Sequence, residues 1–163
     1  MAADGVGPPG DARSDTADAG RDAEPADTRA DSLPPDLRVP VPCTPPGPTY
    51  QVSASDVVDL MQTRCDGSRC HVGGFAAGLD MRREVFFDNT VGIPSNNSPL
   101  LRIHPGQPSR SFLYLKLTGQ QAGAGRRMPS GGPYLGSAEL SLVRRFIEDC
   151  AHEGAVAGAA VGP

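Results

Sequence analysis

Glycine and proline limit this chain to short regular elements joined by long loops. The 20 glycines and 17 prolines are nearly a quarter of the 163 residues, well above average usage. Neither residue suits the interior of a helix or a strand. With no tryptophan, three tyrosines and five phenylalanines, the side chains alone would form a modest core. A domain of ~100 residues built this way would gain from a large apolar cofactor or a disulfide.

Composition divides the chain into three parts. The first 42 residues hold nine acidic side chains against four arginines, and residues 1–48 contain almost no large apolar side chain. Such a segment cannot bury enough surface to offset its conformational entropy. We therefore predict a disordered, acidic tether over 1–48, with a stiff proline-rich end. We further predict a domain over 49–152 and a flexible Gly/Ala tail over 153–163.

Apolar spacing within the domain predicts an all-α fold with long Gly/Pro loops. Val57, Val58 and Met61 fall on one face of a helix that Ser55 can cap. Ser137 is expected to cap the clearest helix, in which apolar residues recur at helical spacing up to Cys150. No strand pattern appears. Helices are predicted over 55–65, from 80 to 87, from 109 to 119 and over 137–150, with a proline-rich loop over 89–108.

The stretch Cys65-Asp-Gly-Ser-Arg-Cys70-His71 carries the chemistry. Two thiols at a helix end can add to the two vinyl groups of a haem, and the adjacent imidazole can bind the iron. The usual attachment motif has two residues between the cysteines, whereas this one has four. The same spacing is compatible with a small Cys65–Cys70 disulfide loop.

A six-coordinate haem needs a second axial ligand, which in cytochromes c is usually a methionine. Met128 lies in a Gly/Pro loop, where Pro129 favours an extended conformation. Met61 and Met81 lie on predicted helices, where packing is the default role. Met128 is therefore the preferred ligand, and His104 would give a bis-His site instead.

The motifs of residues 55–152 resemble those of the c-type cytochrome domains of exported proteins in myxobacteria and planctomycetes. The shared segments are Cys70-His71-Val-Gly-Gly, Gly78-Leu79-Asp80-Met81, Pro105-Gly106-Gln-Pro108-Ser-Arg-Ser111 and Met128-Pro-Ser-Gly-Gly-Pro133-Tyr-Leu135. The resemblance implies a class I cytochrome c-like fold and one covalent haem c. It also implies thioethers at Cys65 and Cys70, with His71 and Met128 as axial ligands of the iron.

Several further side chains are expected around this haem. Leu79 and Leu135 are candidates to face it, and the charges of Arg126 and Arg127 can neutralise haem propionates or acidic groups of a partner. Other apolar candidates are Leu101, Phe112, Leu113 and Phe146. Each of these apolar residues would also serve an ordinary core.

Cys43 and Cys150 remain after the haem pair, and we predict a disulfide between them in an oxidising compartment. Three functions compete. The first is electron transfer through a His/Met-ligated haem. The second is a haem-free binding or spacer module stapled by two disulfides. The third is a zinc site of Cys65, Cys70, His71 and one more ligand. No base–nucleophile pair or carboxylate dyad stands out, so we do not expect an enzyme.

Charge and hydropathy bound the partners and the location. The net charge of −4 argues against nucleic acid, and no run of ~20 apolar residues predicts a transmembrane segment. The chain shows no signal sequence. We expect a periplasmic or otherwise extracytoplasmic protein, with a lipid anchor upstream of the tether as one way of holding it at the outer membrane. Redox protein partners are expected, but the sequence does not identify them.

Overall fold

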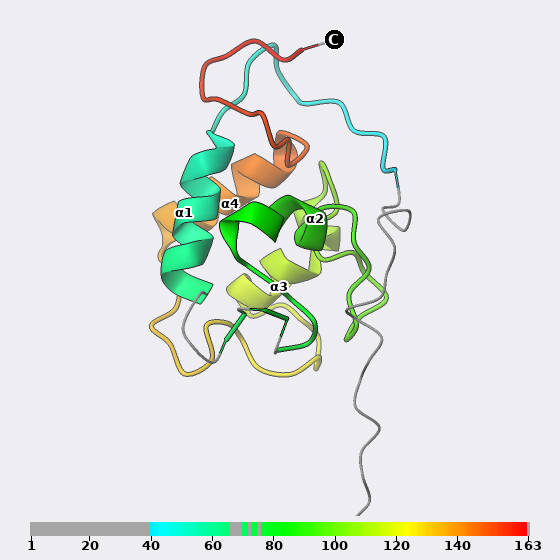
Figure 1. The fold of residues 1–163 in the computed structure, drawn as a ribbon, viewed down its shortest axis with the longest axis vertical. Coiled ribbons are helices and arrows are strands. Elements are labelled where there is room, and N and C mark those ends of the chain that lie inside the picture. The colour runs from blue at the N-terminus through cyan, green and yellow to red at the C-terminus, as the bar shows by residue number, and fades with distance from the viewer. Residues whose placement is uncertain (1–39, 66–69, 72, 75, 163) are drawn as a thin grey trace, which may run out of the picture.

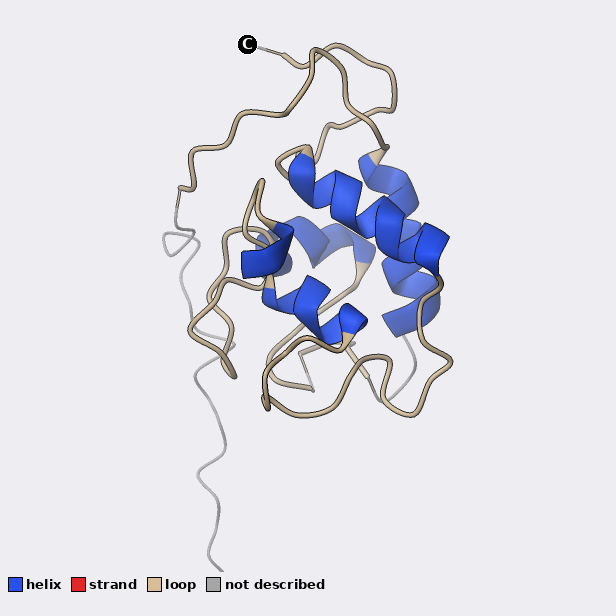
Figure 2. Cartoon of the chain, turned by 180° about the vertical axis from the view of Figure 1, so that it is seen from behind, coloured by secondary structure: helices blue, strands red, loops and turns tan. Residues whose placement is uncertain are grey.

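The computed structural model describes residues 40–65, 70–71, 73–74 and 76–162, so most of the predicted tether lies outside the described residues. Within these ranges helices are the only regular elements, and only isolated β-bridges accompany them (Figure 2). The described chain forms α1 (Ala54–Cys65), η2 (Arg83–Val85), α2 (Phe86–Thr90), η3 (Pro108–Arg110), α3 (Phe112–Thr118) and α4 (Ser137–Glu148). The prediction of an all-α domain is confirmed for the described part.

The first and last helices pack against each other, as predicted. The apolar face of α1 buries Val57, Val58 and Met61, while α4 buries Val143, Phe146 and Ile147. At the rim, the Arg64 guanidinium lies 2.7 Å from the Glu139 carboxylate. Glu139 also accepts a hydrogen bond from the Gly136 N–H at 2.8 Å, which caps the start of α4. This backbone bond, followed by Arg64, lowers the pKa of Glu139.

The two short helices begin later than their sequences suggested. Asp80 was expected to cap a helix, but its carboxylate binds the backbone and the guanidinium of Arg82, and η2 starts at Arg83. Ser109, the predicted start of the third helix, lies in η3 instead, and α3 begins only after Ser111. The Ser111 hydroxyl bonds to Gln107 O and His104 N–H, which holds this residue in an extended turn. Gly119, with φ +83°, ends α3 as predicted.

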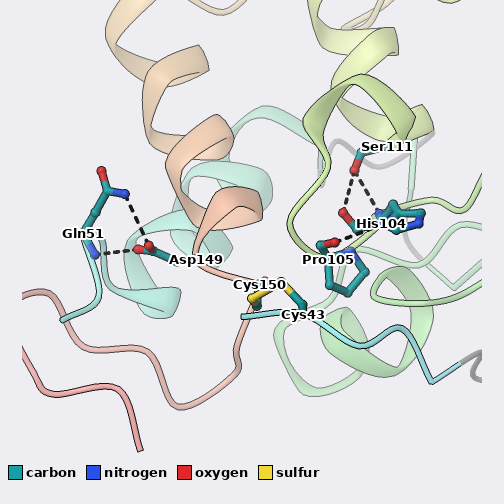
Figure 3. The surroundings of a disulfide bond; sticks show 7 residues. All are labelled: Cys43, Gln51, His104, Pro105, Ser111, Asp149 and Cys150. Carbon is teal, nitrogen blue, oxygen red and sulfur yellow. Dashed lines mark hydrogen bonds between the residues drawn. A yellow bond between two sulfur atoms is a disulfide. The ribbon is translucent and has the colours of Figure 1, made fainter. Parts of the chain in front are cut away.

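The predicted Cys43–Cys150 disulfide is present. The two Cα atoms lie 5.7 Å apart, and the bond joins residues separated by 107 positions in the sequence. Close by, the buried Asp149 carboxylate accepts the Gln51 N–H at 2.5 Å (Figure 3). Together these contacts fix the entry to the domain against the end of α4.

The segment after α4 is part of the folded domain. We predicted a flexible tail over 153–163 from its Gly/Ala composition, yet its described residues run alongside residues 48–54. Backbone hydrogen bonds join Ala54 to Ala155, Tyr50 to both Gly158 and Ala159, and Pro48 to Val161. Small residues permit this close backbone pairing, and the buried Tyr50 ring stacks on His152 with centroids 5.5 Å apart.

The molecule has two contrasting ends (Figure 1). We call the first the termini end: it consists of residues 40–54 and 149–162. We call the second the loop end: it consists of the described residues of 65–81, the segment 119–136 that joins α3 to α4, and the adjoining side chains of Asn89, Arg102 and Lys116. The apolar core of α1, α3 and α4 lies between them. The loop end contains the predicted haem-binding residues Cys65, Cys70, His71, Leu79, Met128 and Leu135.

Candidate functional site

The cysteine motif begins where α1 ends. Cys65 is the last residue of α1; it is buried, and its sulfur lies 4.0 Å from that of Met61. The His71 N–H donates a hydrogen bond to the Cys65 carbonyl at 3.2 Å. His71 therefore lies beside the end of α1, and residues 66–69 lie outside the described ones. Cys70, immediately before His71, is exposed and free.

His71 is half-buried and held by its backbone on both sides. Besides the bond to Cys65, its carbonyl accepts the Met81 N–H at 2.8 Å. Its Nδ1 atom is buried with no hydrogen-bond partner among the described residues. Burial is the main cause of a lowered His71 pKa; the nearby backbones of Ala76 and Leu79 oppose the shift without forming a well-aligned bond. Burial thus favours the neutral imidazole, which is the form that binds metals.

Met128 lies in the loop between α3 and α4. Its N–H donates to the Lys116 carbonyl at 2.9 Å, and its side chain is half-buried against the core. Met61 and Met81, by contrast, are fully packed, with 0% and 2% of their surface exposed, as the sequence predicted. Lys116 also lies within electrostatic range of His71, whose pKa its charge lowers. Lys116 thus accepts a hydrogen bond from the backbone of Met128 and acts on His71 through its charge.

The alternative ligand His104 is held by local hydrogen bonds. It is buried, its backbone N–H donates to the Ser111 hydroxyl at 2.9 Å, and its Nδ1 lies 3.0 Å from the Pro105 carbonyl. Figure 3 shows these contacts in the surroundings of the disulfide. The local hydrogen bonds of His104 favour a structural role.

Four of the six predicted apolar haem neighbours belong to the core or border it. Leu135 is 4% exposed, and Leu79 is partly buried against the same cluster. Leu113 and Phe146 are also buried, whereas Leu101 and Phe112 are half-buried. Of the two predicted basic residues, Arg126 is exposed. Arg127 donates from Nε to the Leu117 carbonyl and stacks over Tyr134, 4.2 Å from its ring centroid.

Sequence reasoning missed Arg102, which the structure places in this region. Its side chain is 5% exposed, and its Nη1 donates to the carbonyl and the side-chain oxygen of Asn89, both at 2.7 Å. Burial lowers its pKa, and its charge, like that of Lys116, lowers the pKa of His71. The available signal was an arginine inside the apolar run from Leu100 to Ile103.

The zinc site considered from sequence is not assembled among the described residues: no three His, Cys, Asp or Glu side chains there come together as a metal-binding group. No helix in the described ranges has the length and hydropathy needed to cross a membrane. Comparisons with protein-family models, curated proteins and solved structures find no match to this chain. The cytochrome resemblance therefore remains a prediction.

Proposed function

We propose that this chain is an extracytoplasmic electron-transfer domain that carries one covalently attached haem c in a class I cytochrome c-like fold. In this proposal Cys65 and Cys70 form the thioethers, and His71 and Met128 bind the iron. The haem supplies a one-electron couple when bound. In this proposal the domain is not an enzyme, since His71 and Met128 would fill both axial positions of the iron.

The observation that carries the proposal is the state of His71. Its ring is half-buried, its Nδ1 atom has no partner among the described residues, and its surroundings disfavour the protonated form. A buried polar atom without a partner is rare in folded proteins and calls for an explanation. A group bound to the imidazole would be such an explanation. His71 directly follows the exposed Cys70 and lies beside the end of α1.

The remaining residues fit the same group. Met128 offers a thioether from a loop anchored on α3, while the other candidate ligand, His104, is engaged locally. The packing of α1 on α4 agrees with the class I arrangement expected from the resemblance. The Cys43–Cys150 disulfide supports an oxidising, extracytoplasmic location. That location is also where covalent haem attachment is expected.

The alternative is a haem-free binding or spacer module stapled by disulfides. The Cys43–Cys150 bond and the paired termini favour it, because they stabilise the domain without a cofactor. However, Cys70 is a free cysteine in the structure, rather than half of the second bridge that this alternative includes.

The deciding experiment is maturation of the full chain in a periplasm with c-type haem machinery. We expect a haem-stainable band after denaturing electrophoresis and a low-spin visible spectrum. A chain without covalent haem under these conditions would refute electron transfer and leave the stapled module. Met128→Ala should keep the haem attached but open an axial position and lower the reduction potential, because thioether ligation favours reduced iron. Met81→Leu is the matched control, since Met81 belongs to the core.

A further inference from the structure

Arg102 is held rigidly in the interior next to the loop end. Its N–H donates to the Ile93 carbonyl at 2.7 Å, and its own carbonyl accepts the Leu113 N–H at 2.9 Å. The residue therefore joins the loop before it to the beginning of α3, and only 5% of its surface is exposed. Its backbone is fixed on both sides, and two hydrogen bonds to Asn89 hold its guanidinium in place.

The hydrogen bonds of this guanidinium do not neutralise its charge. The two acceptors, both on Asn89, are neutral, and across the described ranges no carboxylate forms an ion pair with Arg102. The Asn89 side-chain oxygen also accepts the Asp80 N–H, but the Asp80 carboxylate is taken by Arg82. Buried charges in proteins are normally paired, because desolvating an isolated ion is costly.

A second cationic side chain acts on the same histidine as Arg102. Lys116 shares the neighbourhood of His71 with Arg102, and its Nζ donates to the neutral Ala124 carbonyl at 2.9 Å. None of the described residues accepts a hydrogen bond from Nε or Nη2 of Arg102. Together, these two donors can bind a carboxylate in bidentate fashion.

We infer that Arg102 forms a binding site for a carboxylate that is not supplied by the described part of the chain. The inference rests on the proposed function: the carboxylate is then a haem propionate, held by Arg102 rather than by the predicted Arg126 and Arg127. Arg127 is already engaged with Leu117 and Tyr134. A free carboxylate from solution has the same chemistry and is the second source to be tested.

The test compares Arg102→Gln with the surface control Arg110→Gln in the haem-loaded full chain. Glutamine keeps a donor for Asn89 but removes the charge, and Arg110 is exposed. We expect Arg102→Gln to lower the midpoint reduction potential and to shift the propionate bending band in the resonance Raman spectrum. Arg110→Gln should leave both unchanged. Arg102→Lys should retain most of the potential but still shift the band. A potential and a band equal to wild type in Arg102→Gln would overturn the inference.

Unfolding of the haem-free chain separates ligand binding from a structural role. An unpaired buried charge destabilises the chain that lacks its ligand, so haem-free Arg102→Gln should unfold at the same urea concentration as wild type or at a higher one. A lower midpoint than wild type would make Arg102 a structural residue and contradict the site.

Failure of this inference can be distinguished from failure of the proposed function. Covalent haem in the wild type depends on the cysteines, so a wild type without haem-stainable band refutes the function regardless of Arg102. Acetate is then the probe for the haem-free chain. Thermal stabilisation by acetate over chloride at equal ionic strength, lost in Arg102→Gln, would preserve a carboxylate site without haem. No acetate effect in that chain would remove the site as well.

Discussion

The two ends of this molecule differ in whether particular buried polar groups have partners. At the termini end, the fully buried Asp149 carboxylate accepts the Gln51 N–H, and Cys43 is bonded to Cys150. At the loop end, among the described residues, the Nδ1 atom of His71 has no partner and the charge of Arg102 has no carboxylate. Both ends adjoin one apolar core, so the difference does not arise from packing alone.

The contrast shows how stability and binding are distributed over the fold. A buried polar group that lacks its hydrogen bond destabilises the native state, so such groups persist mainly where something else completes them. The termini end completes its own groups and stabilises the domain. At the loop end, Nδ1 of His71 and the charge of Arg102 lack such partners among the described residues, which fits the binding role proposed for this region.

The largest expected effect comes from the cysteines of the loop end. The double substitution Cys65→Ala and Cys70→Ala should abolish covalent haem altogether, because no thiol of the motif remains to form a thioether. Haem staining after denaturing electrophoresis measures this. The termini end should be unaffected, so the variant should still show an intact Cys43–Cys150 bond by thiol counting. A haem-stained band in the double variant would contradict the assigned attachment sites.

The disulfide tests the termini end directly. Cys43→Ala with Cys150→Ala should lower the free energy of unfolding by roughly 2–5 kcal/mol, since the bond closes a loop of about a hundred residues in the unfolded chain. Urea unfolding of the haem-free chain provides the value. Reduced wild type is the control and should match the variant. Two additional reactive thiols in the oxidised, denatured wild type would show that the bond is absent in solution.

Asp149 allows a subtler change at the same end. Asp149→Asn weakens a buried bond to the Gln51 N–H and should destabilise the chain by about 1–3 kcal/mol. Glu148→Gln, on the partly exposed neighbouring position, is the matched control and should have a smaller effect. Equal urea midpoints for the two variants would show that Asp149 does not hold the entry segment.

The smallest effect is a pH dependence at the loop end. Burial lowers the His71 pKa in the folded, haem-free chain, so the unfolded chain binds more protons just below pH ~6.5. Stability should therefore decline as the pH falls from about 6.5 through the lower, folded-state pKa. His71→Gln should flatten this decline in urea midpoints measured from pH 7.5 to 5, whereas the exposed His152→Gln should not. An unchanged slope in His71→Gln would place the imidazole in solvent.

Some of these features could be predicted because their signals are local. The apolar face of α1, the helix from Ser137 and the stop at Gly119 follow from spacing and backbone preferences within a few residues. The packed role of Met61 followed from its position on a predicted helix. Met81 is packed as well, although it precedes η2 and does not lie on a helix. The Cys43–Cys150 pair followed from the number of cysteines left outside the haem motif.

By itself, then, the sequence determined the helical class, the long Gly/Pro loops and which residues are candidates to bind a haem. Only the tertiary structure decided that residues 155–161 pair with 48–54, because backbone hydrogen bonds between small residues leave no pattern in the side chains. It likewise decided that Arg102 is buried beside His71 without a carboxylate. Whether a charge is solvated or buried depends on elements distant in the chain, and the hydropathy of its own neighbours does not determine it.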